Sequence, residues 1–209
     1  PAANTNGWHN SDVTVSFSGS DETSGIAACS DPIILSSEGA NQAPGGSCSD
    51  NAGNVSTAGV SINIDKSAPV VSVTGVEEGA IYILGDVPAA SCATSDALSG
   101  VAVEAGLTLS GGNPDGSGSI TATCDGALDN AGNSGAASVI YTVLTPQDAT
   151  AVVQGDIQTL IDEDVLKPGQ ANGLTKPLEN TIRSLDKGNT VAACNQLGDF
   201  IGEVNAKTP

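Results

Sequence analysis

The sequence predicts two tandem β-sandwich domains followed by a bundle of three short helices. The first observation is an internal repeat: the five residues 50–54 recur as residues 129–133, and the phrase 21–26 recurs in related form as 96–101. The second is a series of short strand-like segments between clusters of turn residues up to about residue 145, of which residues 12–18 alternate apolar and polar with period two. The third is a helical spacing of apolar residues after Pro146.

Three domains follow from these patterns. The matched phrases are offset by about 75 to 79 residues, which is longer than a solenoid period and suits tandem β domains. We call residues 1–66 repeat 1, residues 67–146 repeat 2 and residues 147–209 the C-terminal module.

Short strands separated by turn residues are expected in both repeats. In repeat 1, Val13, Val15 and Phe17 alternate with polar residues, so their side chains should share one face. The number of strands expected in repeat 2 is that of an immunoglobulin-like sandwich. The other expected strands are 33–35 and 60–64 in repeat 1, and 70–74, 81–84, 89–94, 101–109, 117–124 and 136–143 in repeat 2.

The start of repeat 1 differs from that of repeat 2. Val70–Thr74 precedes Tyr82, whereas the segment before Trp8, which we place opposite Tyr82, has no strand pattern. Repeat 1 is therefore expected to lack its first strand. Two explanations remain open: the chain was cut there, or another molecule supplies the strand by β-strand addition, which would make the protein a fibre subunit.

Three helices are expected in the C-terminal module. Asp148 is a candidate N-cap of the first, Gly188 a candidate stop of the second and Asn189 a candidate cap of the third. Pro177 is expected near the start of the second helix, because a proline inside a helix costs about 3 kcal/mol. The acids 162–164 at the end of the first helix are expected to be solvated.

Composition restricts the classes of function. The chain has 24 acidic and 6 Lys or Arg residues, and residues 1–148 hold 16 of the acids against one base, Lys66. Such a surface disfavours nucleic acid and anionic membranes as partners, and it either attracts cations or simply keeps the protein soluble. No apolar run is long enough to insert into a bilayer. Five cysteines, few lysines and the absence of an initial Met indicate a processed product or a fragment of a secreted protein.

Several phrases resemble those of a known family. D-x-x-S-G-[IV], D-N-A-G-N and the phrase I-N-I-D-K-x-A-P at residues 62–69 resemble the tandem immunoglobulin-like repeats of large bacterial secreted and surface proteins, over about residues 1–145. The phrases at 166–174, 185–190 and 192–197 resemble the small C-terminal helical module called FIMAH. The resemblance implies a modular extracellular protein and implies no catalysis.

Two disulfides are predicted with this resemblance in view. Cys92 and Cys124 resemble the bridge between the second and sixth strands of immunoglobulin sandwiches. Repeat 1 has Phe17 in place of Cys92, and its own two cysteines enclose a different loop. Cys194 falls on the apolar stripe of the third helix and is expected to be buried and unreactive. The predicted bridges are Cys29–Cys48 and Cys92–Cys124.

Two interpretations of the Asp phrases remain open. Asp and Asn followed by Gly suit turns that need no ligand. Alternatively the phrases bind Ca²⁺, which takes six to eight oxygen ligands in proteins. The candidate ligands are Asp21, Glu22, Asp50, Asn51 and the linker residue Asp65 at one domain end, and Asp96, Asp129 and Asn130 in repeat 2.

The predicted function is not enzymatic. His9, the single histidine, is expected in a loop, and no residues form a nucleophilic, zinc-binding or phosphate-binding motif. We expect a secreted or cell-surface structural or adhesive protein, stiffened by Ca²⁺, that binds other protein subunits or assembles with itself. The alternative is a carbohydrate-binding accessory region of a secreted hydrolase, in which an exposed Trp8 would stack on a polysaccharide.

Overall fold

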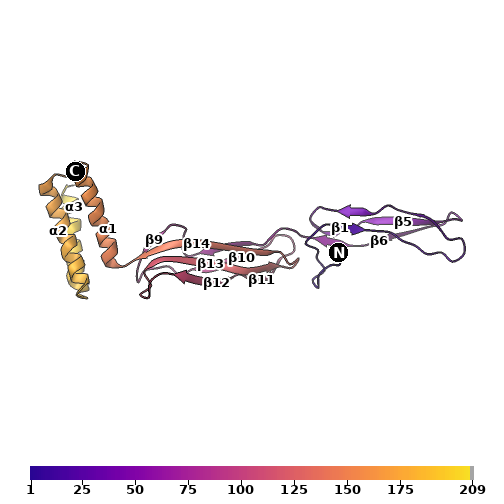
Figure 1. Ribbon diagram of the computed structural model, residues 1–209, viewed down its shortest axis with the longest axis horizontal. Coiled ribbons are helices and arrows are strands. Elements are labelled where there is room, and N and C mark those ends of the chain that lie inside the picture. The colour runs from indigo at the N-terminus through magenta and orange to yellow at the C-terminus, as the bar shows by residue number, and fades with distance from the viewer. Residues whose placement is uncertain (208–209) are drawn as a thin grey trace. The chain divides into compact units, whose positions relative to one another are not determined.

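The computed structural model describes residues 1–207, apart from the side chains of Pro168 and Lys207. A β-rich region of several antiparallel sheets is followed by three packed helices, which confirms the predicted fold class (Figure 1). The chain divides into two compact units. Unit 1 comprises residues 1–75, 90–109 and 122–138, and unit 2 comprises residues 76–89, 110–121 and 139–209.

Repeat 1 contains seven short strands in the described chain. Strand β1 pairs with β3, β4 pairs with β7, and β5 lies between β2 and β6, all antiparallel. The apolar core consists of Val13, Ile62 and Ile64, packed against Val15 and Leu35. The strands are β1 (Val13–Val15), β2 (Ile26–Cys29), β3 (Ile33–Leu35), β4 (Gly39–Gln42), β5 (Gly45–Asp50), β6 (Val55–Gly59) and β7 (Ile62–Ile64).

Repeat 2 contains two sheets. Strand β8 pairs with β10, and the second sheet has the order β11-β13-β14-β9, with β12 also paired to β13. The β9 strand runs parallel to β14, whereas β11 is antiparallel to β13. The strands are β8 (Val70–Thr74), β9 (Ile81–Ile83), β10 (Ser91–Ser95), β11 (Val101–Val103), β12 (Gly106–Gly111), β13 (Gly118–Asp129) and β14 (Ser134–Leu144).

A parallel bridge at the start of repeat 1 matches the parallel pair of repeat 2. His9 bridges Ile64, as Tyr82 on β9 pairs with Val143 on β14. Because Ile64 precedes Val143 by the repeat offset of 79 residues, His9 takes the position of Tyr82. The predicted placement of Trp8 opposite Tyr82 is therefore wrong by one residue, and His9 lies in a β-bridge rather than in a loop.

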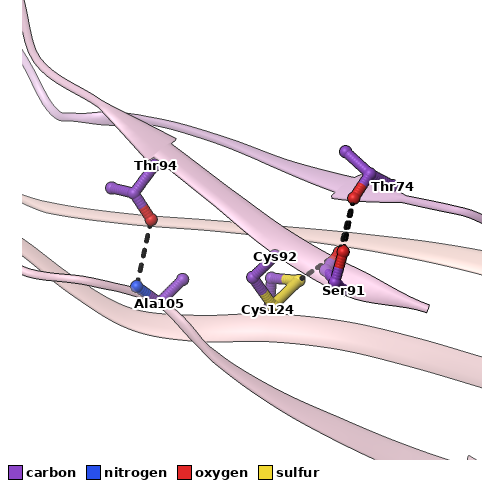
Figure 2. The surroundings of a disulfide bond; sticks show 6 residues. All are labelled: Thr74, Ser91, Cys92, Thr94, Ala105 and Cys124. Carbon is purple, nitrogen blue, oxygen red and sulfur yellow. Dashed lines mark hydrogen bonds between the residues drawn. A yellow bond between two sulfur atoms is a disulfide. The ribbon is translucent and has the colours of Figure 1, made fainter. Parts of the chain in front are cut away.

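Both predicted disulfides are present. The Cys92–Cys124 bridge joins β10 to β13, which belong to different sheets, with 5.7 Å between the Cα atoms (Figure 2). Beside it, the hydroxyl groups of Thr74 and Ser91 lie 2.7 Å apart and link β8 to β10. The Cys29–Cys48 bridge instead joins directly opposite residues of the neighbouring strands β2 and β5. One bridge thus ties two sheets together, and the other reinforces a single sheet.

The C-terminal module is built on the helix α2 (Pro168–Leu185), which packs against both α1 (Pro146–Asp162) and α3 (Thr190–Lys207). Gly188 has a φ of +70° after the end of α2, and the Asn189 side chain accepts the Ala192 N–H at 3.1 Å, as predicted. The apolar core is formed by Ile157, Leu174 and Leu178, with Ile161, Leu166, Leu197 and Phe200 packed against them.

Three expectations for the helices are corrected. The N-cap of α1 is Thr145, whose hydroxyl accepts the N–H of Asp148, so Asp148 lies in the first turn instead. Pro177 lies inside α2, where the buried Leu174 and Leu178 on either side of it offset the cost of the missing hydrogen bond. Cys194 is exposed.

The exposure of Cys194 follows from the packing of α3. The face toward the helical core carries Ala193, Leu197 and Phe200, which follow helical spacing and are buried or half-buried. Cys194 lies one position past this face. The acids 162–164, by contrast, are exposed as expected.

Candidate metal centre at the linker between the repeats

The two repeated phrases contact each other within each repeat. In repeat 1, the backbone N–H of Asn51 donates to the carbonyl of Gly25 at 3.0 Å. In repeat 2, the N–H of Asn130 donates to the carbonyl of Gly100 at 2.9 Å. The phrases therefore recur together in the sequence because they form the two halves of one paired turn.

The aspartates of the paired turn in repeat 1 bind backbone groups. Asp21 accepts N–H groups of the three residues from Thr23 to Gly25, with Gly25 at 2.9 Å. Asp50 accepts the N–H and the side-chain amide of Asn54 at 2.8 and 2.7 Å. The hydrogen bonds from Ser24 and Gly25 lower the pKa of Asp21, and those from Asn54 lower the pKa of Asp50. These carboxylates thus have a structural use that requires no metal.

The equivalent turn of repeat 2 keeps the bonds to Gly100 and Asn133, but the N–H of Ser99, which is equivalent to Ser24, donates to Asp65 instead of Asp96. Asp96 accepts the Gly100 N–H at 2.6 Å, and Asp129 accepts the Asn133 N–H at 2.8 Å. Asp129 is only 2% exposed, and Asp96 is half-buried. Turn chemistry is therefore common to both repeats, whereas burial of the carboxylates is confined to the second.

A third carboxylate joins Asp96 and Asp129. Asp65, in the linker after β7, is 0% exposed, and one oxygen each from Asp65, Asp96 and Asp129 lies within 4.8 Å of the other two. We call these three residues the Asp cluster. No second group of three acidic, histidine or cysteine side chains lies this close in the described part of the chain.

The structure thus places Asp65 with the ligands predicted for repeat 2 and not with those predicted for repeat 1. Asp21 and Glu22 are exposed and lie outside the Asp cluster, as does Asp50. Asn51 and Asn130 use their side-chain amides to bind carbonyl groups of the facing phrase, at 2.8 and 2.9 Å.

Backbone contacts hold Asp65 against repeat 2. Its Oδ2 accepts the N–H of Ser99 at 3.0 Å, and its carbonyl accepts the side-chain amide of Asn133 at 2.9 Å. Its Oδ1 accepts the N–H of Ser67, two residues along the linker, at 3.1 Å. Asp65, near the end of repeat 1, is therefore an integral part of the paired turn of repeat 2.

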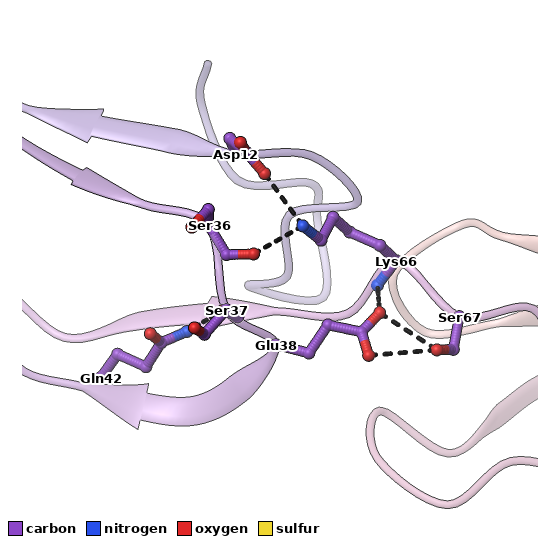
Figure 3. A network of polar contacts seen from close by, with 7 residues as sticks. All are labelled: Asp12, Ser36, Ser37, Glu38, Gln42, Lys66 and Ser67. Atoms are coloured by element: carbon purple, nitrogen blue, oxygen red, sulfur yellow. Dashed lines mark hydrogen bonds and ion pairs between the residues drawn. The ribbon is translucent and has the colours of Figure 1, made fainter.

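The next two linker residues, Lys66 and Ser67, form hydrogen bonds with earlier residues of repeat 1 (Figure 3). The backbone N–H of Lys66 and the hydroxyl of Ser67 both donate to the Glu38 carboxylate, at 2.6 and 3.1 Å. The Lys66 ammonium lies 2.9 Å from Asp12 and donates to the carbonyl of Ser36 at 2.6 Å. Three consecutive linker residues are thus bound on two sides within unit 1.

No ion pair with a Lys or Arg of residues 1–148 neutralises the Asp cluster. Lys66 is the only Lys or Arg among residues 1–148, and it pairs with Asp12. Neighbouring N–H groups compensate part of the carboxylate charge, but like charges this close still repel each other, more strongly when buried. The Asp cluster could hold a metal ion, and its all-oxygen ligands suit a hard cation such as Ca²⁺ or Mg²⁺ rather than zinc.

The aromatic residues of the two repeats do not form an exposed flat surface of the kind on which sugar rings stack. Trp8 is half-buried, and Tyr141 is 3% exposed. Tyr82 meets Tyr141 edge to face at a centroid distance of 5.6 Å, as a core pair does. His9 is 7% exposed, and its Nδ1 has no hydrogen-bond partner, a feature that the sequence pattern did not indicate.

Comparisons with known proteins do not assign a family. No family model matches the chain, and no curated protein matches it. A solved structure described as "Structures of Clostridium thermocellum CbhA fibronectin(III)-like modules" is 12% identical, covers 69% of this chain and 92% of that chain, and has a TM-score of 0.32. A TM-score this low does not establish a shared fold. The fold is instead established by the sheet order and the disulfide between sheets.

Two further features bear on where the protein works. Both disulfides point to an oxidising, extracellular environment. None of the helices in residues 1–207 combines the length and the apolarity needed to cross a bilayer.

Proposed function

We propose that the protein is a non-enzymatic extracellular spacer, structural or adhesive in role, whose linker between repeats is stiffened by Ca²⁺ bound at the Asp cluster. The observation that carries this proposal is the complete burial of Asp65 beside Asp96 and Asp129. A linker residue that only connected two independent domains would be expected to stay exposed to solvent.

The linker contacts support a mechanical role. Asp65 is bound to repeat 2, while Lys66 and Ser67 are bound to the Glu38 carboxylate of repeat 1. Each hydrogen bond reduces the conformational freedom of a segment that would otherwise act as a hinge. A cation shared by three carboxylates would add a further restraint at the same point.

The internal repeat supports calcium at the Asp cluster over turn formation alone. In repeat 1, Asp21 and Asp50 accept the equivalent N–H groups of Gly25 and Asn54, and Asp21 also accepts that of Ser24, without a third carboxylate and without full burial. Since the turn of repeat 1 forms without a third acid, turn formation does not explain why repeat 2 gathers three acids, of which Asp65 and Asp129 are buried and Asp96 is half-buried. The oxygen ligands of the Asp cluster and the extracellular environment, where Ca²⁺ is abundant, together favour this cation.

The test is thermal unfolding with Ca²⁺ and with chelator. A ligand that binds only the folded state stabilises it by RT ln(1 + [L]/Kd), so Ca²⁺ at 100 times Kd should add about 2.7 kcal/mol. The D65N variant should lose this response, whereas D21N, the same change in an exposed turn, should keep it. An unfolding temperature of the unsubstituted protein that is equal in Ca²⁺ and chelator would refute the calcium site.

A further inference from the structure

A groove of about 490 Å³ runs along repeat 1. One wall is the segment Ser16–Ser20, which follows β1, and the other is formed by residues of β5 and β6. Two exposed apolar side chains line the groove: Val55 is 65% exposed and Ile26 is 37% exposed. All the groove-lining residues belong to unit 1.

The same place in repeat 2 is filled by a strand. Residues 75 positions after Ser16–Ser20 form β10, and every residue of β10 is paired with β8, from Ser91 with Thr74 to Ser95 with Val70. In repeat 1, the extended pairing of β1 ends at Val15, and Ser16–Ser20 belong to no strand. The missing partner accounts for the loss of strand structure in this segment.

The opposite wall of the groove, on β6, also corresponds to a surface that is covered in repeat 2. Gly135 of β14 lies 79 residues after Ser56 of β6, and a Cβ on Gly135 would clash with the Pro69 carbonyl and approach Val71 Cγ2 to 3.1 Å. The segment leading into β8 therefore lies against β14 in repeat 2. Its counterpart in repeat 1 is the groove between Ser16–Ser20 and β6.

We propose that this groove is an acceptor site for an extended polypeptide strand that carries apolar β-branched residues at alternate positions, as β8 does. The guest strand runs antiparallel to Ser16–Ser20, with the register of β8 on β10. Its inward residues correspond to Val71 and Val73, which are half-buried in repeat 2, while Val70, Ser72 and Thr74 are exposed. The inference deepens the proposed structural role and rests on it for its biological meaning, since strand addition is a means of joining modular chains.

Repeat 1 differs from repeat 2 at one point of the site. Ser56 has a side chain where Gly135 has none, and Gly135 is where the Pro69 backbone approaches. A guest strand must therefore stay further from β6 at its first residue. It can still pair with Ser16–Ser20, whose backbone donors and acceptors are the main source of affinity in strand addition.

The test uses the 209-residue protein and a peptide with the sequence of residues 68–75. The control peptide has aspartate at the positions of Val71 and Val73. Because short strands bind weakly, the same two segments are also joined ahead of Pro1 through a flexible Gly-Ser linker, which raises the effective concentration to the order of millimolar. Hydrogen exchange of the Ser16–Ser20 amides is measured in each sample.

The valine segment should slow exchange of the Ser16–Ser20 amides at least tenfold, and the aspartate segment should not. S56Y, which fills the groove, should abolish the effect, whereas T14Y, at an exposed position of β1 outside the groove, should not. Absence of slowing in the joined form, equal slowing by the aspartate segment, or protection of these amides by dimerisation without any peptide would each overturn the proposal. The calcium response is recorded on the same samples, so that failure of the strand site is distinguished from failure of the proposed spacer.

Discussion

Phe17 lies directly over the backbone of Gly46, where an added Cβ would come within 2.7 Å of three ring atoms. Phe17 precedes Cys92 by 75 residues, and Gly46 is one residue from the position equivalent to Cys124. The aromatic ring on a bare backbone thus replaces, in repeat 1, the disulfide that ties the two sheets of repeat 2. The two cysteines of repeat 1 lie at other positions and bridge β2 and β5.

This contact predicts a large effect from one methyl group. G46A should destabilise repeat 1 by about 1 to 3 kcal/mol, because an added Cβ would overlap the Phe17 ring and either the ring or the β5 backbone must shift. G45A is the matched control, since a Cβ there meets only the Ala58 carbonyl at 3.5 Å. Urea unfolding of the two variants measures the difference. Equal free energies of unfolding would show that the Phe17 ring is not confined.

The two disulfides are predicted to contribute unequally. The chain-entropy model gives each loop about 3 to 4 kcal/mol. Cys124 is fully buried between sheets, so replacing Cys92 and Cys124 by alanine should cost this amount and a packing term as well. Replacing Cys29 and Cys48 should cost less, because their strands are already paired. Denaturant unfolding of the two double variants measures the loss of unfolding free energy in each. A larger loss from the Cys29–Cys48 replacement would contradict the prediction.

The architecture could be predicted from the sequence because local signals agreed with the fold. Val13, Val15 and Phe17 alternate in exposure as period two requires, and the paired Asp phrases lie at turns. Gly53 and Gly132 have φ values of +90° and +93°, which explains why both copies of D-N-A-G-N have glycine there.

The missed features depend on contacts between distant segments. Asp65 lies closer in sequence to Asp50 than to Asp96, yet it is bound by Ser99 and Asn133. Sequence proximity therefore assigned it to the wrong repeat. The apolar stripe of α3 similarly placed Cys194 within reach of the core, but which edge of a stripe is buried depends on where α2 packs.

Cys194 should be the single reactive thiol of the native protein. It is exposed, whereas the other four cysteines form disulfides. A thiol reagent should therefore label one site per chain without denaturant, and C194S should remove the labelling. Labelling followed by mass spectrometry measures the stoichiometry. Labelling that requires denaturant would restore the buried position expected from the helical stripe.

The stability of repeat 1 is predicted to fall in acid through Asp21 and Asp50. Their hydrogen bonds hold the pKa of each carboxyl below its ordinary value of 3.8, so the folded state binds fewer protons than the unfolded state near this pH. The stabilisation is fully present above the unfolded pKa and is lost as the pH falls through the folded one. Below about pH 4, the free energy of unfolding should decline less steeply in D21N/D50N than in the unsubstituted protein. E104Q, at an exposed position outside the turns, is the control and should keep the original slope, and an unchanged slope in D21N/D50N would show that these turns do not contribute to acid sensitivity.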